Sequence, residues 1–110
     1  MILNASRPRD AQGDMIDVFT YFGGKSLALT TSSARVAVPT DAGLICLYVT
    51  GNDCYVKFGD SSVTTDSSDG DYDVVLAAGA YFLHPVIQSG MYVAAATLSS
   101  TGTLYVFGMK

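Results

Sequence analysis

The only histidine of the chain, His84, is the first residue to consider for chemistry, because imidazole titrates near neutral pH. Pro85 follows it and favours extended backbone at His84. A catalytic histidine would need a serine or cysteine nucleophile and a carboxylate close in space. The sequence has no Gly-x-Ser-x-Gly elbow, and neither Cys46 nor Cys54 lies in a local catalytic signature. We therefore interpret His84 as a strand-end or interface histidine, and we expect neither enzymatic activity nor a cofactor.

A cluster of aspartates between residues 66 and 73 is the second candidate. Carboxylates at this density could hold a calcium ion, which prefers hard oxygen ligands. The spacing does not match an EF-hand loop, and no bidentate glutamate follows it. A solvated hairpin tip has the same composition. We favour the polar loop, and the candidate cation ligands are Asp66, Asp69, Asp71 and Asp73.

The two cysteines, Cys46 and Cys54, flank a predicted turn at Gly51-Asn52-Asp53. In a hairpin with a two-residue loop their side chains point to opposite faces of the sheet. With a three-residue loop they share a face but lie about 13 Å apart along the strands. A disulfide requires Cα atoms within about 7 Å. We therefore predict free, mostly buried thiols.

Composition excludes several classes of partner. Charged residues make up 15% of the chain, against roughly 25% in an average soluble domain. Six scattered Lys and Arg and a net charge of −4 argue against binding to nucleic acid or to a membrane surface. No signal-peptide pattern and no apolar run of spanning length is present. Since apolar residues reach 49%, we expect part of the surface to be covered by another protein.

Strand signals recur every eight to twelve residues from Lys25 onward, and no segment has sustained helical periodicity. The apolar run Leu44–Thr50 predicts a central strand, and we expect it to form a hairpin with Cys54–Phe58. About eight strands favour an all-β, two-sheet β-sandwich or jelly-roll-like domain over residues 25–110. The other predicted strands are Ser26–Thr30, Ala34–Val38, Tyr72–Leu76, Ala80–Leu83, Met91–Thr97 and Thr103–Phe107, with a further short strand at Val63–Thr65.

Residues 1–24 lack this alternation and combine turn formers with isolated apolar residues. An edge strand with a disordered tail would have this pattern. An extended N-terminal arm that orders against a neighbouring subunit would have it too. For the second interpretation the partner-binding candidates are Ile2, Leu3, Arg7, Arg9, Met15, Ile16, Phe19, Tyr21 and Phe22. The apolar side chains would insert into grooves, and the arginines would pair with carboxylates.

Three segments resemble small virion proteins of tailed bacteriophages, namely Cys54–Thr64, Leu76–Ala80 and Tyr92–Ala96. They are similar to a V-x-F-G-x-x-x-V hairpin, an A-G-A turn and a late Y-V-A-A strand. Within this class the chain resembles the capsid decoration (cement or staple) proteins of epsilon-fifteen-like short-tailed phages, over roughly residues 34–107.

This resemblance implies a β-sandwich or jelly roll on the outer capsid surface of a virion, made in the host cytoplasm. Its partners would be the major capsid protein and other copies of itself, as a dimer or trimer at a symmetry axis. The family has no catalytic residues to transfer. The alternative is a recognition module: a phage tail or head-fibre domain, or a carbohydrate-binding sandwich that uses the 66–73 loop and Tyr72.

Overall fold

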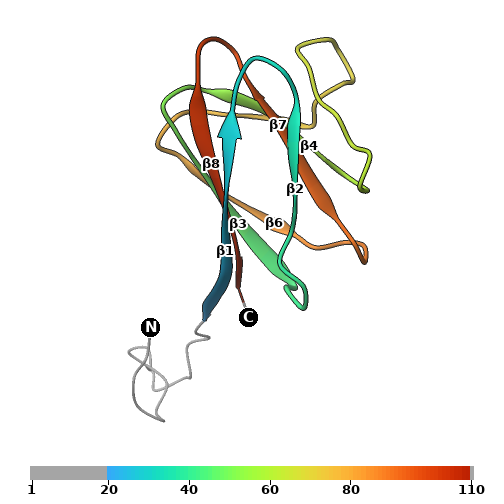
Figure 1. Cartoon of the computed structure of the whole chain (residues 1–110). Coiled ribbons are helices and arrows are strands. Elements are labelled where there is room, and N and C mark those ends of the chain that lie inside the picture. The colour runs from blue at the N-terminus through green and yellow to red at the C-terminus, as the bar shows by residue number, and fades with distance from the viewer. Residues whose placement is uncertain (1–19, 110) are drawn as a thin grey trace, which may run out of the picture.

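The computed structural model describes residues 20–109; residues 1–19 and Lys110 are outside the described part. Eight strands form two four-stranded antiparallel sheets that pack face to face (Figure 1). The first sheet has the order β1-β8-β3-β6, and the second has the order β2-β7-β4-β5. The strands are β1 (Tyr21–Leu29), β2 (Ala34–Ala37), β3 (Leu44–Thr50), β4 (Cys54–Gly59), β5 (Val74–Leu76), β6 (Tyr81–Pro85), β7 (Tyr92–Thr97) and β8 (Gly102–Met109).

Successive strands alternate between the two sheets, except that β4 and β5 are neighbours in the second. This connectivity is jelly-roll-like. The predicted all-β sandwich is therefore confirmed. The predicted short strand at Val63–Thr65 does not form, since this segment has no ladder partner. No helix within residues 20–109 is long and apolar enough to cross a membrane.

The hairpin predicted between Leu44–Thr50 and Cys54–Phe58 is wrong. β3 pairs with β6 and β8, whereas β4 pairs with β5 and β7, so the turn between them crosses from one sheet to the other. Gly51 makes the crossing possible, because its φ is +94° and a Cβ there would lie 2.9 Å from the Cα of Gly102. Turn residues between two apolar runs fit a hairpin and a crossing equally well.

The core lies between the sheets and is formed by alternate residues of the central strands. Ile45, Leu47 and Val49 of β3 are fully buried, and Leu104 and Val106 of β8 lie beside them. From the second sheet, Cys54, Val56, Val93 and Ala95 pack against this layer. β3 is a central strand, as its apolar sequence predicts.

β1 begins at Tyr21, inside the segment assigned to the N-terminal arm. Its register with β8 shifts between Phe22 and Lys25, where Gly23 has a φ of +66°. Phe22 packs against the core, and Gly108 of β8 leaves space for its ring, since a Cβ at Gly108 would lie 2.7 Å from Phe22 Cζ. Residues 21–24 therefore belong to the sandwich as well as to the predicted arm.

Candidate functional site

The outer surface of the first sheet carries rows of aromatic and apolar side chains. Side chains of a strand alternate between the faces, so the residues next to the buried Ile45, Leu47 and Val49 point outward. In the ladder Tyr48 is paired with Tyr81 of β6 on one side and with Tyr105 of β8 on the other. In the next row Cys46 is paired with Leu83 and Phe107. We call this surface the aromatic face, and it is formed by Tyr21, Cys46, Tyr48, Tyr81, Leu83, Tyr105, Phe107 and Met109.

The rings of the aromatic face contact one another. Tyr48 and Tyr81 are stacked with ring centroids 4.5 Å apart, and Tyr105 lies 6.3 Å from Tyr48. At the other end of the face Tyr21 meets Phe107 edge to face at 5.5 Å. Such pairs contribute about 0.5–1.5 kcal/mol each beyond the area they bury. The aromatic side chains therefore hold one another in a defined arrangement before any partner binds.

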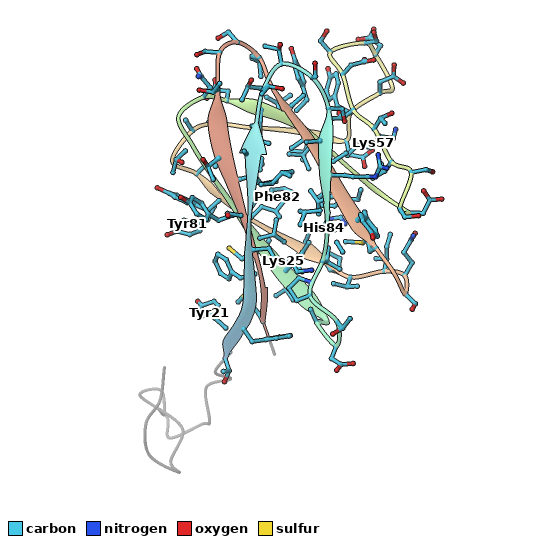
Figure 2. The ribbon with its side chains drawn as sticks, in the orientation of Figure 1. Tyr21, Lys25, Lys57, Tyr81, Phe82 and His84 are labelled. Atoms are coloured by element: carbon cyan, nitrogen blue, oxygen red, sulfur yellow. The ribbon has the colours of Figure 1, made fainter. Side chains whose placement is uncertain are left out.

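Several of these side chains are exposed to solvent. Tyr81 is 69% exposed, Tyr21 61% and Leu83 55%. Figure 2 shows Tyr21 and Tyr81 on the same side of the sandwich, with Lys57 on the opposite side. The two depressions on the aromatic face are open and shallow, lined mainly by its rings. Their lining lacks the convergent polar groups of a small-molecule site, and an extended apolar surface is typical of a protein interface.

The outer face of the second sheet is partly covered by the chain itself. Ala94 and Ala96 of β7 point away from the core but are almost completely buried. The segment between β4 and β5 lies over this face, where Val63 and Thr65 are themselves buried. Thr65 N donates to Ser33 Oγ at 3.0 Å and ties the segment to the β1–β2 connection. Among residues 20–109 the two outer faces thus differ, because a connection covers part of the second sheet and none covers the aromatic face.

Charged side chains are also distributed unequally between the two outer faces. The aspartates of residues 20–109 lie in the β2–β3, β3–β4 and β4–β5 connections, and none of them lies on the aromatic face. Lys25 is at the β1 edge of the aromatic face, whereas Arg35 and Lys57 are on strands of the second sheet. The aromatic face therefore offers hydroxyl groups and apolar surface, with no carboxylate.

Two of the predicted partner-binding residues can be placed. Tyr21 belongs to the aromatic face, while Phe22 points the other way and contacts the core. Phe22 is therefore a packing residue as well as a contact candidate. The other candidates are outside the described residues, namely Ile2, Leu3, Arg7, Arg9, Met15, Ile16 and Phe19.

The aspartate-rich connection between β4 and β5 uses its carboxylates within the loop. Asp66 Oδ1 accepts a hydrogen bond from Ser68 N at 2.7 Å, and this bond holds the pKa of Asp66 below its usual value. Asp73 Oδ2 accepts from Phe58 N at 3.0 Å. The candidate ligands Asp66, Asp69, Asp71 and Asp73 do not converge, and residues 20–109 contain no group of three or more His, Cys or Asp side chains placed to hold a metal ion.

His84 lies between the sheets, where its ring stacks on that of Phe58 (Figure 2). Its Nε2 atom is buried without a hydrogen-bond partner in residues 20–109. Burial lowers the pKa of His84, and the negative charge of Asp73 offsets part of this effect. No serine or cysteine is hydrogen-bonded to the ring among these residues, so the surroundings of His84 are those of a packed interior side chain.

Sequence analysis missed the central residues of the aromatic face. These residues come from three strands that are far apart in the sequence: Tyr48 from β3, Tyr81 and Leu83 from β6, and Tyr105 and Phe107 from β8. Alternation in each strand could have shown which residues share its face. Only the pairing of β3 with β6 and β8 brings them together, and this pairing was hidden by the wrong hairpin.

Comparison of the chain with protein-family models, curated proteins and solved structures gave no match. The class that fold and site define is an all-β sandwich with an exposed aromatic face on its first sheet.

Proposed function

We propose that this chain is a structural protein of a tailed-phage virion, which decorates the outer capsid surface and cements it by bridging major capsid protein subunits. The observation that carries the proposal is the contrast between the two faces. One is partly covered by the chain's own loop, while the other exposes ordered aromatic rings and, within residues 20–109, no carboxylate. Such a surface favours contact with protein over catalysis.

The sequence resemblance supports a capsid as the protein surface that the chain binds. The segments that carry it form β4, the turn before β6, and β7. They belong to the body of the sandwich, with the aromatic face on the opposite sheet. The predicted N-terminal arm and the aromatic face could contact the same capsid surface, because Tyr21 belongs to both.

The proposed mechanism is linkage between binding and assembly. A domain that binds only adjacent capsid subunits in the closed shell adds its binding free energy to that state alone. Many copies act on one lattice, so modest contacts sum to a large effect. The arm residues Ile2, Leu3, Met15, Ile16 and Phe19 would enter grooves between subunits, and Arg7 and Arg9 would pair with capsid carboxylates.

The carbohydrate-binding alternative has weaker support. Tyr72 packs against Tyr55 with ring centroids 5.2 Å apart, and the nearby carboxylates of Asp66 and Asp73 accept backbone hydrogen bonds. On the aromatic face, Tyr48 and Tyr81 stack on each other. Part of the ring surface that a sugar would need is therefore already occupied.

The test uses shells assembled from the major capsid protein encoded in the same genome. We expect the full-length chain to co-sediment with these shells and to raise their melting temperature. The variant Arg7→Glu/Arg9→Glu should lose co-sedimentation. As a control, the charge reversal Arg35→Glu, at the exposed residue of β2, should retain it. Absence of wild-type binding, or a genome without a major capsid protein, would contradict the proposal. If the Arg7→Glu/Arg9→Glu variant still binds the shells, the N-terminal arm is not the capsid contact.

A further inference from the structure

One main-chain bond in the β4–β5 connection is placed for a covalent change. We propose that the bond between Asp69 and Gly70 is a site of spontaneous isoaspartate formation, which redirects the main chain through the Asp69 side chain. The inference goes beyond the proposed function, because it concerns the chain itself and requires no partner. Asp69-Gly70 is the single Asp-Gly pair of the sequence, and the sequence has no Asn-Gly pair.

The reaction needs only these two residues and water. The Gly70 amide nitrogen attacks the side-chain carboxyl carbon of Asp69 and forms a new C–N bond. The protonated carboxyl group loses its hydroxyl, which leaves as water with the amide proton, and a five-membered succinimide ring remains. Water then adds to one of the two ring carbonyls. Opening at the side-chain carbonyl restores aspartate, whereas opening at the main-chain carbonyl leaves an isoaspartyl link with one extra methylene carbon in the main chain.

The Gly70 amide is open to this attack. Gly70 N donates no hydrogen bond within residues 20–109. Glycine has no Cβ to crowd the nitrogen, and no atom lies within 4 Å of the place where one would be. Gly70 is exposed, with a φ of +83°, in a four-residue turn that the bond from Asp71 N to Ser68 O closes at 3.0 Å. Neither a hydrogen bond nor a side chain therefore protects the nitrogen.

The Asp69 carboxyl group is also unoccupied. It is exposed, and it makes no hydrogen bond or ion pair within the described residues. Asp60 Oδ1, in contrast, accepts from Ser62 N at 2.9 Å and from Ser62 Oγ at 2.7 Å. Asp66 Oδ1 accepts from Ser68 N at 2.7 Å. These bonds hold the pKa of Asp60 and that of Asp66 below the usual value, so the protonated form that can lose water is scarcer.

The change would disturb the hydrogen bonds that hold the connection in place. Lys57 Nζ donates to Gly70 O at 3.0 Å, and Thr65 Oγ1 donates to Asp71 O at 2.8 Å. Thr65 is 5% exposed and belongs to the segment that covers part of the second sheet. An extra main-chain atom between Asp69 and Gly70 alters the turn that carries both acceptors. We therefore expect isoaspartate to loosen this segment and to lower the melting temperature.

Ageing of the full-length chain for several weeks at neutral pH and physiological temperature tests the proposal. Peptide mapping by mass spectrometry, with an isoaspartate-specific methyltransferase as the label, locates the product. We expect isoaspartate at residue 69 to exceed that at Asp60 and at Asp66 at least about tenfold. Asp69→Glu is the matched control, because it keeps the charge but would have to close a six-membered ring, which forms much more slowly. The melting temperature should fall with age in the wild type and stay constant in this variant.

Isoaspartate that is absent from residue 69, or spread evenly over the exposed aspartates, overturns the proposal. Isoaspartate at residue 69 without a fall in melting temperature relative to Asp69→Glu confirms the site and overturns its effect on the connection. No capsid enters the experiment, so its outcome is separate from that of co-sedimentation. A chain that fails to bind shells can still form isoaspartate at residue 69, and a chain that binds them can fail to do so.

Discussion

The rings of Phe58 and His84 lie face to face, with centroids 3.8 Å apart and planes inclined by 4°. Phe58 belongs to β4 of the second sheet and His84 to β6 of the first, so this contact joins the two sheets. Phe82 lies 6.4 Å from Phe58 and extends the stack. The only histidine of the chain thus lies where the two sheets meet.

This contact predicts that the free energy of unfolding decreases as the pH falls. Burial lowers the pKa of His84 below 6.5 in the folded protein, although Asp73 opposes the shift. The unfolded chain therefore binds a proton first, and protons favour unfolding below about pH 6.5. The full contribution is present above that pH. Urea denaturation from about pH 7 to about pH 5 should show a falling midpoint.

The matched variant is His84→Phe, which keeps an aromatic ring on Phe58 and removes the titration. It should show a smaller fall over the same pH range than the wild type. At neutral pH it should be at least as stable, since it removes a buried Nε2 atom without a partner, a defect that costs about 1–3 kcal/mol. Equal pH dependence of the two proteins would assign the effect to other groups.

The crossing between the sheets predicts a cost for a side chain at residue 51. Gly51→Ala combines a φ of +94° with a Cβ 3.0 Å from Thr101 O, so we expect a loss of about 1–3 kcal/mol in the free energy of unfolding. Gly70→Ala is the control, because its φ is +83° but nothing lies within 4 Å of its Cβ. It should cost about 1 kcal/mol. Equal losses in thermal or urea denaturation would show that the close approach has no effect.

The hydrogen bonds of the aspartate-rich connection predict no stabilisation by calcium. Asp66 accepts a hydrogen bond from Ser68 N within the loop, whereas Asp73 accepts one from Phe58 N of β4, so the two carboxylates are held at separate places. At about 1 mM calcium, a site with the affinity of extracellular modules would raise the melting temperature measurably. We expect the melting curve to stay unchanged, with magnesium as the control. If calcium raises the melting temperature and Asp66→Asn or Asp73→Asn abolishes that increase, the prediction is wrong and the loop binds a cation.

The two thiols should differ in reactivity toward a disulfide reagent in the folded protein. Cys54 is fully buried in the core, and burial, with a smaller effect of Asp53, raises its pKa to about 11. Cys46 is 4% exposed beneath the aromatic face, and burial raises its pKa as well. We expect slow reaction of Cys46, still slower reaction of Cys54, and fast reaction of both in denaturant. Separate Cys→Ser variants identify each phase.

The strands were predictable from the sequence, and their partners were not. Alternation located most of the strands, because burial of one face imposes a period of two, and a continuous apolar run located β3. β1 begins at Tyr21, before the predicted start at Ser26. Both cysteines are free and buried, as predicted, although the hairpin used for that argument is wrong. Local turn residues cannot specify whether the chain returns beside its strand or crosses to another sheet. That choice depends on contacts such as Gly51 with Gly102, which are distant in sequence.

Only one residue at the edge of the aromatic face was predictable from the sequence. Tyr21 was named among the contact residues, and its place on the aromatic face agrees with an exposed role. Phe22, the adjacent aromatic residue and also a predicted contact residue, points into the sandwich toward Gly108. Tyr48, Tyr81 and Tyr105 become a row only through the register of β3 with β6 and β8.

The connection between β4 and β5 has a consequence for how far association can proceed. A sandwich with an apolar interaction surface on both outer faces could form an open-ended stack, because each bound molecule would leave its second face free to bind another. Here Val63 and Thr65 are buried over part of the second sheet, so this side offers less free surface than the first sheet. Association through sheet faces would therefore use mainly one side of each molecule, which would favour a small closed complex over a filament.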